Sequence, residues 1–147
     1  SLLASGLEDS LYISRFLPPS AKKVIFTYPT PLDARSGHLP DCHWSSLNFF
    51  NDPPLDRLSD PRIAAAYVRE NFEPINGDPH YGDVIFFMDP STKEAHHSCV
   101  YLADDIVYTK NGRSLLEPWV FMHLSEVRDI YGMHIASETV VYRRKKI

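Results

Sequence analysis

The fold is decided by residues 96–112, which read HHSCVYLADDIVYTKNG. Apolar and aromatic residues alternate on both sides of Ala103–Asp105, a pattern typical of two short strands joined by a tight turn. His97 stands at the start of the first strand and Asn111 at the end of the second. A histidine with an orienting polar partner on a neighbouring strand is half of a nucleophilic site. The other half would be an upstream thiol, and Cys42 is suitably placed to provide it.

The segment around Cys42 predicts a short helix. Trp44, Leu47 and Phe50 recur at helical spacing, and Asp41 is a good N-cap residue. Cys42 would then lie in the first turn, where unpaired backbone N–H groups favour a thiolate and stabilise an oxyanion.

The choice between the two adjacent histidines depends on the faces of the strand. Successive side chains of a strand point to opposite faces. His97 therefore shares a face with Cys99 and Tyr101, whereas His96 shares the other face with Ser98. The pattern does not tell which face meets the Cys42 helix.

The rest of the chain predicts elements of both kinds. Helices are expected over residues 1–17, 61–72 and 126–131, strands over 22–28, 84–88, 119–122 and 139–142, and loops over 29–40 and 74–79. The four basic residues at 143–146 are expected to be a solvated tail. Because helices come early and strands late, the α+β class is favoured over an alternating βαβ fold.

The bulk properties suit one globular domain. The chain has 147 residues, of which 44% are hydrophobic and 12% aromatic, enough for one real core. A net charge of −4 gives no basic footprint, so no nucleic-acid partner is expected. No apolar run approaches the roughly 20 residues of a membrane span, so no stable membrane insertion is expected. No signal peptide is recognised at the start of the chain.

Two cysteines are too few for a disulfide framework. They allow a Cys42–Cys99 disulfide, or one nucleophile and one core thiol, or two metal ligands. A zinc site built from Cys42, His43, His97 and Cys99 lacks the usual spacing of paired ligands. Neither a metal nor another cofactor is therefore expected.

Three motifs follow one another along the chain: Asp41-Cys42 at a helix start, GDVIFF over residues 82–87, and HSCVYL over residues 97–102. Together they resemble the NlpC-type family of papain-like cysteine peptidases, which cleave cell-wall peptides. The resemblance covers residues 41 to about 111. It implies a single papain-like domain over residues 1–147, with helices packed on a central antiparallel sheet. Residues 41–147 would be the catalytic core, and residues 1–40 an N-terminal extension without a counterpart.

The resemblance also implies the catalytic roles. Cys42 would be the nucleophile and His97 the general base, acting on a peptide or amide substrate. The family places a His, Asn or Gln on the strand that follows the histidine. Counting in register reaches Thr109, whereas Asn111 lies two residues further along the same face and would come into place through a bulge at Asp104–Asp105. We expect Asn111 to be the third group, with Thr109 as the alternative.

The segment beside the nucleophile departs from the family pattern. Asp41 matches a family residue that helps to bind a free amine of the substrate, whereas His43 and Trp44 replace a Ser-Gly pair. We expect all three residues to bind the substrate. The resemblance further implies a periplasmic or secreted protein. The missing serine leaves open a non-catalytic binding module on the same fold, and an acyltransferase would use the same thioester. The oligomeric state is not defined by the sequence.

Overall fold

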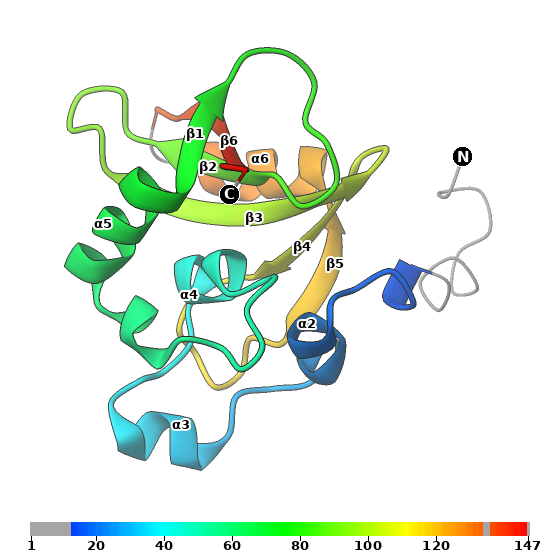
Figure 1. The fold of residues 1–147 in the computed structure, drawn as a ribbon, viewed down its shortest axis with the longest axis vertical. Helices are drawn as coiled ribbons and strands as arrows, with labels where there is room; N and C mark the ends of the chain where they lie inside the picture. Colours follow the sequence, from blue (N-terminus) through cyan, green and yellow to red (C-terminus); the bar gives the residue numbers. More distant parts are fainter. Residues whose placement is uncertain (1–12, 134–135, 147) are drawn as a thin grey trace.

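The computed structural model describes residues 13–133 and 136–146 (Figure 1). These residues form an α+β fold around a six-stranded sheet in which all neighbouring strands are antiparallel. The strands are β1 (Phe72–Ile75), β2 (Val84–Met88), β3 (Ala95–Ala103), β4 (Ile106–Lys110), β5 (Trp119–His123) and β6 (Glu138–Arg144). Their order in space is β1-β6-β2-β3-β4-β5.

The helices are short apart from α5. They are α2 (Pro19–Val24), α3 (Pro31–Ser36), α4 (Cys42–Leu47), the 3₁₀ helix η1 (Asp56–Ser59), α5 (Pro61–Asn71) and α6 (Leu124–Gly132). Two of them begin as the sequence predicts. Asp41 caps α4 by accepting from the N–H of Trp44, and Asp60 caps α5, in which Pro61 takes the first helical position.

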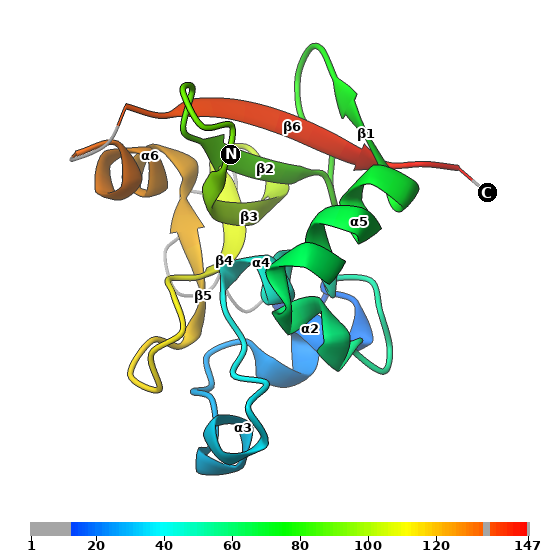
Figure 2. The ribbon, with the colours of Figure 1, turned by 90° about the vertical axis from the view of Figure 1, so that its left-hand side faces the viewer.

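The sheet separates two apolar cores. Figure 2 shows α6 on one side of the central strands and α4 and α5 on the other. The larger core packs α2, α4 and α5 against residues such as Phe86, Val100 and Tyr108. The smaller core packs α6 against residues such as Phe87 and Cys99. Because side chains alternate along β2 and β3, one helical layer meets each face.

The decisive stretch forms the expected hairpin. β3 and β4 pair from Val100–Tyr108 to Ala103–Ile106, with a register shift between Tyr101 and Ala103. Asp104 takes a positive φ of 53° in the connecting turn, a conformation that aspartate tolerates better than most residues. The strands predicted over residues 84–88, 119–122 and 139–142 are confirmed as β2, β5 and β6.

Several predictions in the first half of the chain are wrong. Residues 22–28 form the end of α2 and a turn rather than a strand, because Pro19 takes the first helical position. The loop predicted over residues 29–40 contains α3, which is held by a capping box between Thr30 and Asp33. The helical spacing of Phe50, and the prolines at 53 and 54, predict that the helix around Cys42 runs to residue 51, whereas α4 ends at Leu47. Most of the helix predicted over residues 1–17 lies outside the described residues.

Two further corrections concern the edge of the sheet. The loop predicted over residues 74–79 begins with the end of β1, and Pro74 pairs with Tyr142 of β6. The predicted basic tail starts inside β6, where Arg143 forms two hydrogen bonds of 2.9 and 2.7 Å with the buried carboxylate of Asp83. This bridge ties the last strand to the start of β2. None of the helices described is long and apolar enough to cross a membrane.

Candidate active site

Helix α4 presents Cys42 at its first residue and is fixed to β3 by polar contacts. Asp41 Oδ1 accepts from the backbone N–H of Trp44 at 2.8 Å, which closes the first turn. Ser98 Oγ lies 3.4 Å from the carbonyl oxygen of Cys42 and 3.2 Å from Ser46 Oγ. The position of the helix start on β3 is therefore set by Ser98, a buried residue.

The Cys42 thiol is buried, with only 6% of the residue exposed. Burial raises its pKa to about 11, and the neighbouring carboxylate of Asp41 adds to this rise. The backbone N–H groups of Ser98, His43 and Cys42 itself lower this pKa, because they would stabilise a thiolate. The thiol is thus protonated at neutral pH but is surrounded by the donors that an anion would need.

His97 is fully buried on β3 and packs against two aromatic rings. The ring of Tyr131 stacks on the imidazole at 3.8 Å with an interplanar angle of 9°. The ring of Phe87 lies 5.8 Å away at 50°. Nε2 lies 3.0 Å from Thr109 Oγ1, whereas Nδ1 is buried and has no hydrogen-bond partner among the described residues. One ring nitrogen is therefore fixed and the other is free.

The imidazole is neutral at physiological pH. Burial, and to a smaller extent the neighbouring His43 and His96, lower the pKa of His97 to about 3. When Nε2 carries the proton and donates to Thr109, Nδ1 presents a lone pair. The free nitrogen can then accept a proton.

Cys42 and His97 come from layers on opposite faces of the sheet. Ser98 faces α4, whereas His97 faces α6 through Tyr131. Cys42 nevertheless contacts β3, where Ser98 Oγ lies 3.4 Å from its carbonyl oxygen and the Ser98 N–H lowers the pKa of its thiol. The pairing between β3 and β4 begins at Val100, so Ser98 lies in the part of β3 that precedes this ladder.

Tyr131, whose ring covers His97, also responds to the thiol. Burial is the first cause of its raised pKa, and a charge on Cys42 contributes to the same rise. Cys99, on the same face as His97, is affected by Cys42 in the same way. No hydrogen bond joins Cys42 to His97 in the part of the chain that the structure describes.

Thr109, rather than Asn111, is the ring partner of His97. The side chain of Asn111 instead donates to Met122 Sδ at 3.0 Å and lies 3.5 Å from the Tyr131 hydroxyl. The hairpin does contain an irregularity, between Tyr101 and Ala103, but the imidazole still meets Thr109. The expected contact between Asn111 and His97 is thus corrected in favour of the alternative.

The three residues expected to bind substrate lie in different surroundings. Both carboxylate oxygens of Asp41 have partners, since Oδ2 lies 3.4 Å from the guanidinium of Arg113. His43 Nε2 donates to the carbonyl of Ala95 at 3.3 Å. Trp44 packs against the larger core, and its buried indole nitrogen has no partner among the described residues. Trp44 is therefore mainly a core residue.

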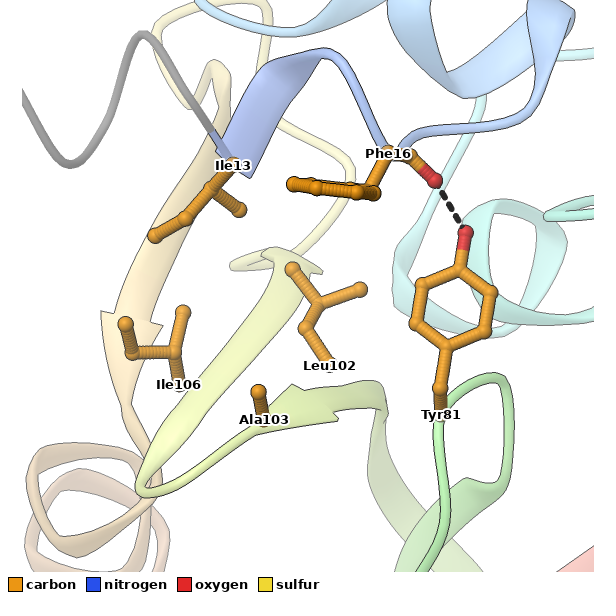
Figure 3. A pocket seen from close by; sticks show the side chains of 6 residues that line it. All are labelled: Ile13, Phe16, Tyr81, Leu102, Ala103 and Ile106. Atoms are coloured by element: carbon orange, nitrogen blue, oxygen red, sulfur yellow. Dashed lines mark hydrogen bonds between the residues drawn. The ribbon is translucent and has the colours of Figure 1, made fainter. Parts of the chain in front are cut away.

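Two hollows lie outside the pair of Cys42 and His97. A groove of about 690 Å³ runs between α5 and the sheet, and His43 lines it. A smaller apolar cavity of about 340 Å³ lies between the N-terminal segment and the β3–β4 hairpin (Figure 3). There the Tyr81 hydroxyl donates to the carbonyl of Phe16. Neither Cys42 nor His97 lines these hollows.

Both cysteines are free thiols, so the possible Cys42–Cys99 disulfide is absent. Over residues 13–133 and 136–146, no group of three or more His, Cys, Asp or Glu side chains is placed to hold a metal ion. The zinc arrangement considered from the sequence is therefore not formed there.

Tyr131 is the main site residue that the sequence analysis missed. Leu124 and Val127 of α6 are buried in the smaller core, and Tyr131 packs against the same core. Their spacing of three and then four residues marks one helix face. This signal identifies the buried face of α6 but not the strand residue beneath it.

Comparisons with protein-family models, curated proteins and solved structures found no match for this chain. Function is therefore inferred from the geometry of the site and from the motifs of the sequence.

Proposed function

We propose that the protein is a cysteine hydrolase of papain-like, NlpC-type architecture that cleaves an amide or peptide bond. Cys42 is the nucleophile, His97 the general base and Thr109 the group that orients the imidazole. The observation that carries this proposal is the state of His97. One ring nitrogen lies 3.0 Å from Thr109 Oγ1, and the other is buried without a hydrogen-bond partner among the described residues, so it can accept a proton.

The first half-reaction forms a thioester. The Cys42 proton passes to Nδ1 of His97, and the sulfur attacks the carbonyl carbon of the substrate. The backbone N–H of Cys42 stabilises the resulting oxyanion. When this intermediate collapses, the C–N bond breaks, and the proton on Nδ1 passes to the leaving amine.

The second half-reaction releases the acid. Nδ1 of His97 takes a proton from water, whose oxygen attacks the thioester carbonyl. The C–S bond breaks, the carboxylic acid leaves, and the proton returns to the Cys42 sulfur. An acyltransferase would differ only in the nucleophile that replaces water.

Burial is the first cause of both pKa shifts at the site, upward for Cys42 and downward for His97. The resting site is therefore a neutral thiol beside a neutral imidazole. A polar substrate that enters the site would partly relieve the desolvation of both groups. Their pKa values would then approach each other, and proton transfer from the thiol would become easier.

A cell-wall or envelope peptide is the proposed substrate, and the periplasm or the cell exterior the proposed location, because of the motifs shared with NlpC-type peptidases. Capture of a substrate amine by Asp41 would require displacement of Arg113, which now occupies Oδ2. The substrate groove would therefore differ from the family pattern beside the nucleophile.

Alkylation with iodoacetamide at neutral pH, followed by mass spectrometry of each cysteine peptide, tests the proposal. Cys42 should react much faster than Cys99, which is completely buried. The rate at Cys42 should fall in His97→Gln and stay unchanged in the matched control His96→Gln. Equal and slow alkylation of both thiols, with no effect of His97→Gln, would reject the enzyme.

A binding module on the same fold is the second candidate. It is favoured by the burial of both groups, since His97 has no exposed surface and Cys42 has 6%. A binding module would hold a peptide without consuming it. Incubation with purified cell-wall peptides separates the two functions, because only the hydrolase releases new amines, and Cys42→Ser should abolish that release.

A further inference from the structure

Tyr131 of α6 makes the closest ring contact at the candidate site. Its ring and the imidazole of His97 are nearly parallel, with centroids 3.8 Å apart. Phe87 lies 5.8 Å from the imidazole and 6.2 Å from Tyr131, tilted against both rings. The imidazole of His97 is therefore confined by aromatic surfaces from β2 and from α6.

The Tyr131 ring is itself anchored. Its hydroxyl lies 3.5 Å from Oδ1 of Asn111. The amide nitrogen of Asn111 donates to Met122 Sδ at 3.0 Å, which leaves Oδ1 directed to the hydroxyl. Asn111 directly follows β4, and Met122 lies in β5. These contacts therefore link α6 to the sheet that carries His97.

One hydrogen bond does not fix an imidazole. The contact between Nε2 and Thr109 leaves the ring free to tilt about that bond, and either tautomer satisfies the threonine hydroxyl. The Tyr131 ring, stacked parallel to the imidazole at 3.8 Å, opposes this tilt because a tilted imidazole would collide with it. An aromatic face also attracts a cation, so it favours the imidazolium that would form when Nδ1 takes a proton.

We propose that Tyr131, anchored by Asn111, is a positioning residue that holds the His97 imidazole with Nδ1 available to the Cys42 thiol. This inference rests on the proposed function. It assigns to Asn111 an indirect role, through Tyr131, in place of the direct contact with His97 that the sequence predicts.

The test compares Tyr131→Leu, which removes the aromatic face, with Tyr131→Phe, which keeps it. Tyr142→Leu is the matched control, because Tyr142 packs edge-on against Phe86 on the other face of the sheet. Two quantities are measured in each folded variant: the ¹⁵N chemical shifts of the His97 ring, which report its tautomer, and the alkylation rate of Cys42.

Tyr131→Leu should give His97 ¹⁵N shifts averaged between two tautomers and an alkylation rate about tenfold lower, a part of what a general base contributes. Tyr131→Phe keeps the aromatic face but loses the bond to Asn111, so its ring shifts and alkylation rate should lie between those of the wild type and Tyr131→Leu. Tyr142→Leu should match the wild type in both. Faster alkylation in Tyr131→Leu would overturn the proposal, because the ring would then be blocking the thiol. Unchanged ring shifts would overturn it as well.

Failure of the proposed function gives a different result. In that case His97→Gln would leave the alkylation of Cys42 unchanged in the otherwise wild-type chain. The ¹⁵N shifts of His97 in Tyr131→Leu would still decide whether Tyr131 positions the ring.

Discussion

At the scale of the residue, the site depends on one buried polar ring. His97 has no exposed surface, and the one hydrogen bond of its ring among the described residues goes to Thr109. A buried polar group that loses its partner costs more free energy than the bond itself contributes, because it is cut off from water. Thr109 is therefore important for both the stability and the chemistry of the site.

Thr109→Val, which removes the hydroxyl and keeps the shape, should lower the free energy of unfolding by about 1–3 kcal/mol. It should also slow the alkylation of Cys42, because Nε2 of His97 loses its partner. Thr109→Ser keeps the hydroxyl and should retain the alkylation rate, at a cost of about 1 kcal/mol for the lost methyl group. Urea unfolding and the iodoacetamide assay measure the two effects. Equal alkylation rates in the two variants would contradict this role.

The place of each residue in an element made Cys42 and the pair of His96 and His97 candidates, and the resemblance to NlpC-type peptidases selected His97 of the two histidines. Cys42 follows a capping aspartate, and His97 lies at the start of a strand. The third group was harder, because Thr109 and Asn111 share a face of β4 and its continuation. Only the three-dimensional path of the hairpin decides which of them meets the imidazole.

At the scale of the element, the start of α4 depends on Asp41, whose carboxylate has both a structural and an electrostatic role. The carboxylate caps the helix through the N–H of Trp44, and its charge contributes to the raised pKa of Cys42. The two roles are separable, because asparagine caps a helix about as well as aspartate but carries no charge.

Asp41→Asn should therefore lower the pKa of Cys42 from about 11 and raise its alkylation rate, with little change in stability. Asp41→Ala should lose about 1 kcal/mol of stability because the cap is lost. A titration of thiolate ultraviolet absorbance in a Cys99→Ser background, together with urea unfolding, measures both quantities. If Asp41→Asn left the Cys42 pKa unchanged, the charge of Asp41 would not act on the thiol.

The strands of the second half and the starts of α4 and α5 were predictable, whereas the segment before α4 and the edge strand β1 were not. β2 and β3 carry the runs of apolar residues expected of central strands. Residues 22–28 have similar residues, but Pro19 begins a helix just before them and Phe26 takes a positive φ of 64°. β1 was missed because it contains Pro74, a residue that sheets tolerate at an edge strand, where β1 lies.

At the scale of the whole molecule, stability should depend on pH through the buried histidines. Burial lowers the pKa of His97 from 6.5 to about 3 and also lowers the pKa of His43. Above pH 6.5, His97 is neutral in both the folded and the unfolded chain, and its contribution to stability is complete. Below that pH, His97 becomes protonated in the unfolded chain but stays neutral in the folded chain until the pH approaches 3.

The free energy of unfolding should therefore fall by about 1.4 kcal/mol per pH unit for His97 alone once the pH is below 6.5. Urea unfolding between about pH 7 and about pH 5 measures this slope, since most carboxylates stay ionised in that range. His97→Gln should show a shallower slope than the wild type. An equal slope in both proteins would mean that His97 is accessible to protons in the folded state.

The position of β6 has a consequence for the integrity of the whole sheet. β6 is the last strand along the chain, yet it lies between β1 and β2, where Arg143 binds Asp83. A polypeptide cut before Glu138 would keep five of the six strands but would leave an empty slot between two of them. β1 and β2 would then each present an unpaired strand edge to the gap. β6 of another copy of the chain could pair with both edges, so limited proteolysis at this point should produce strand-exchanged oligomers.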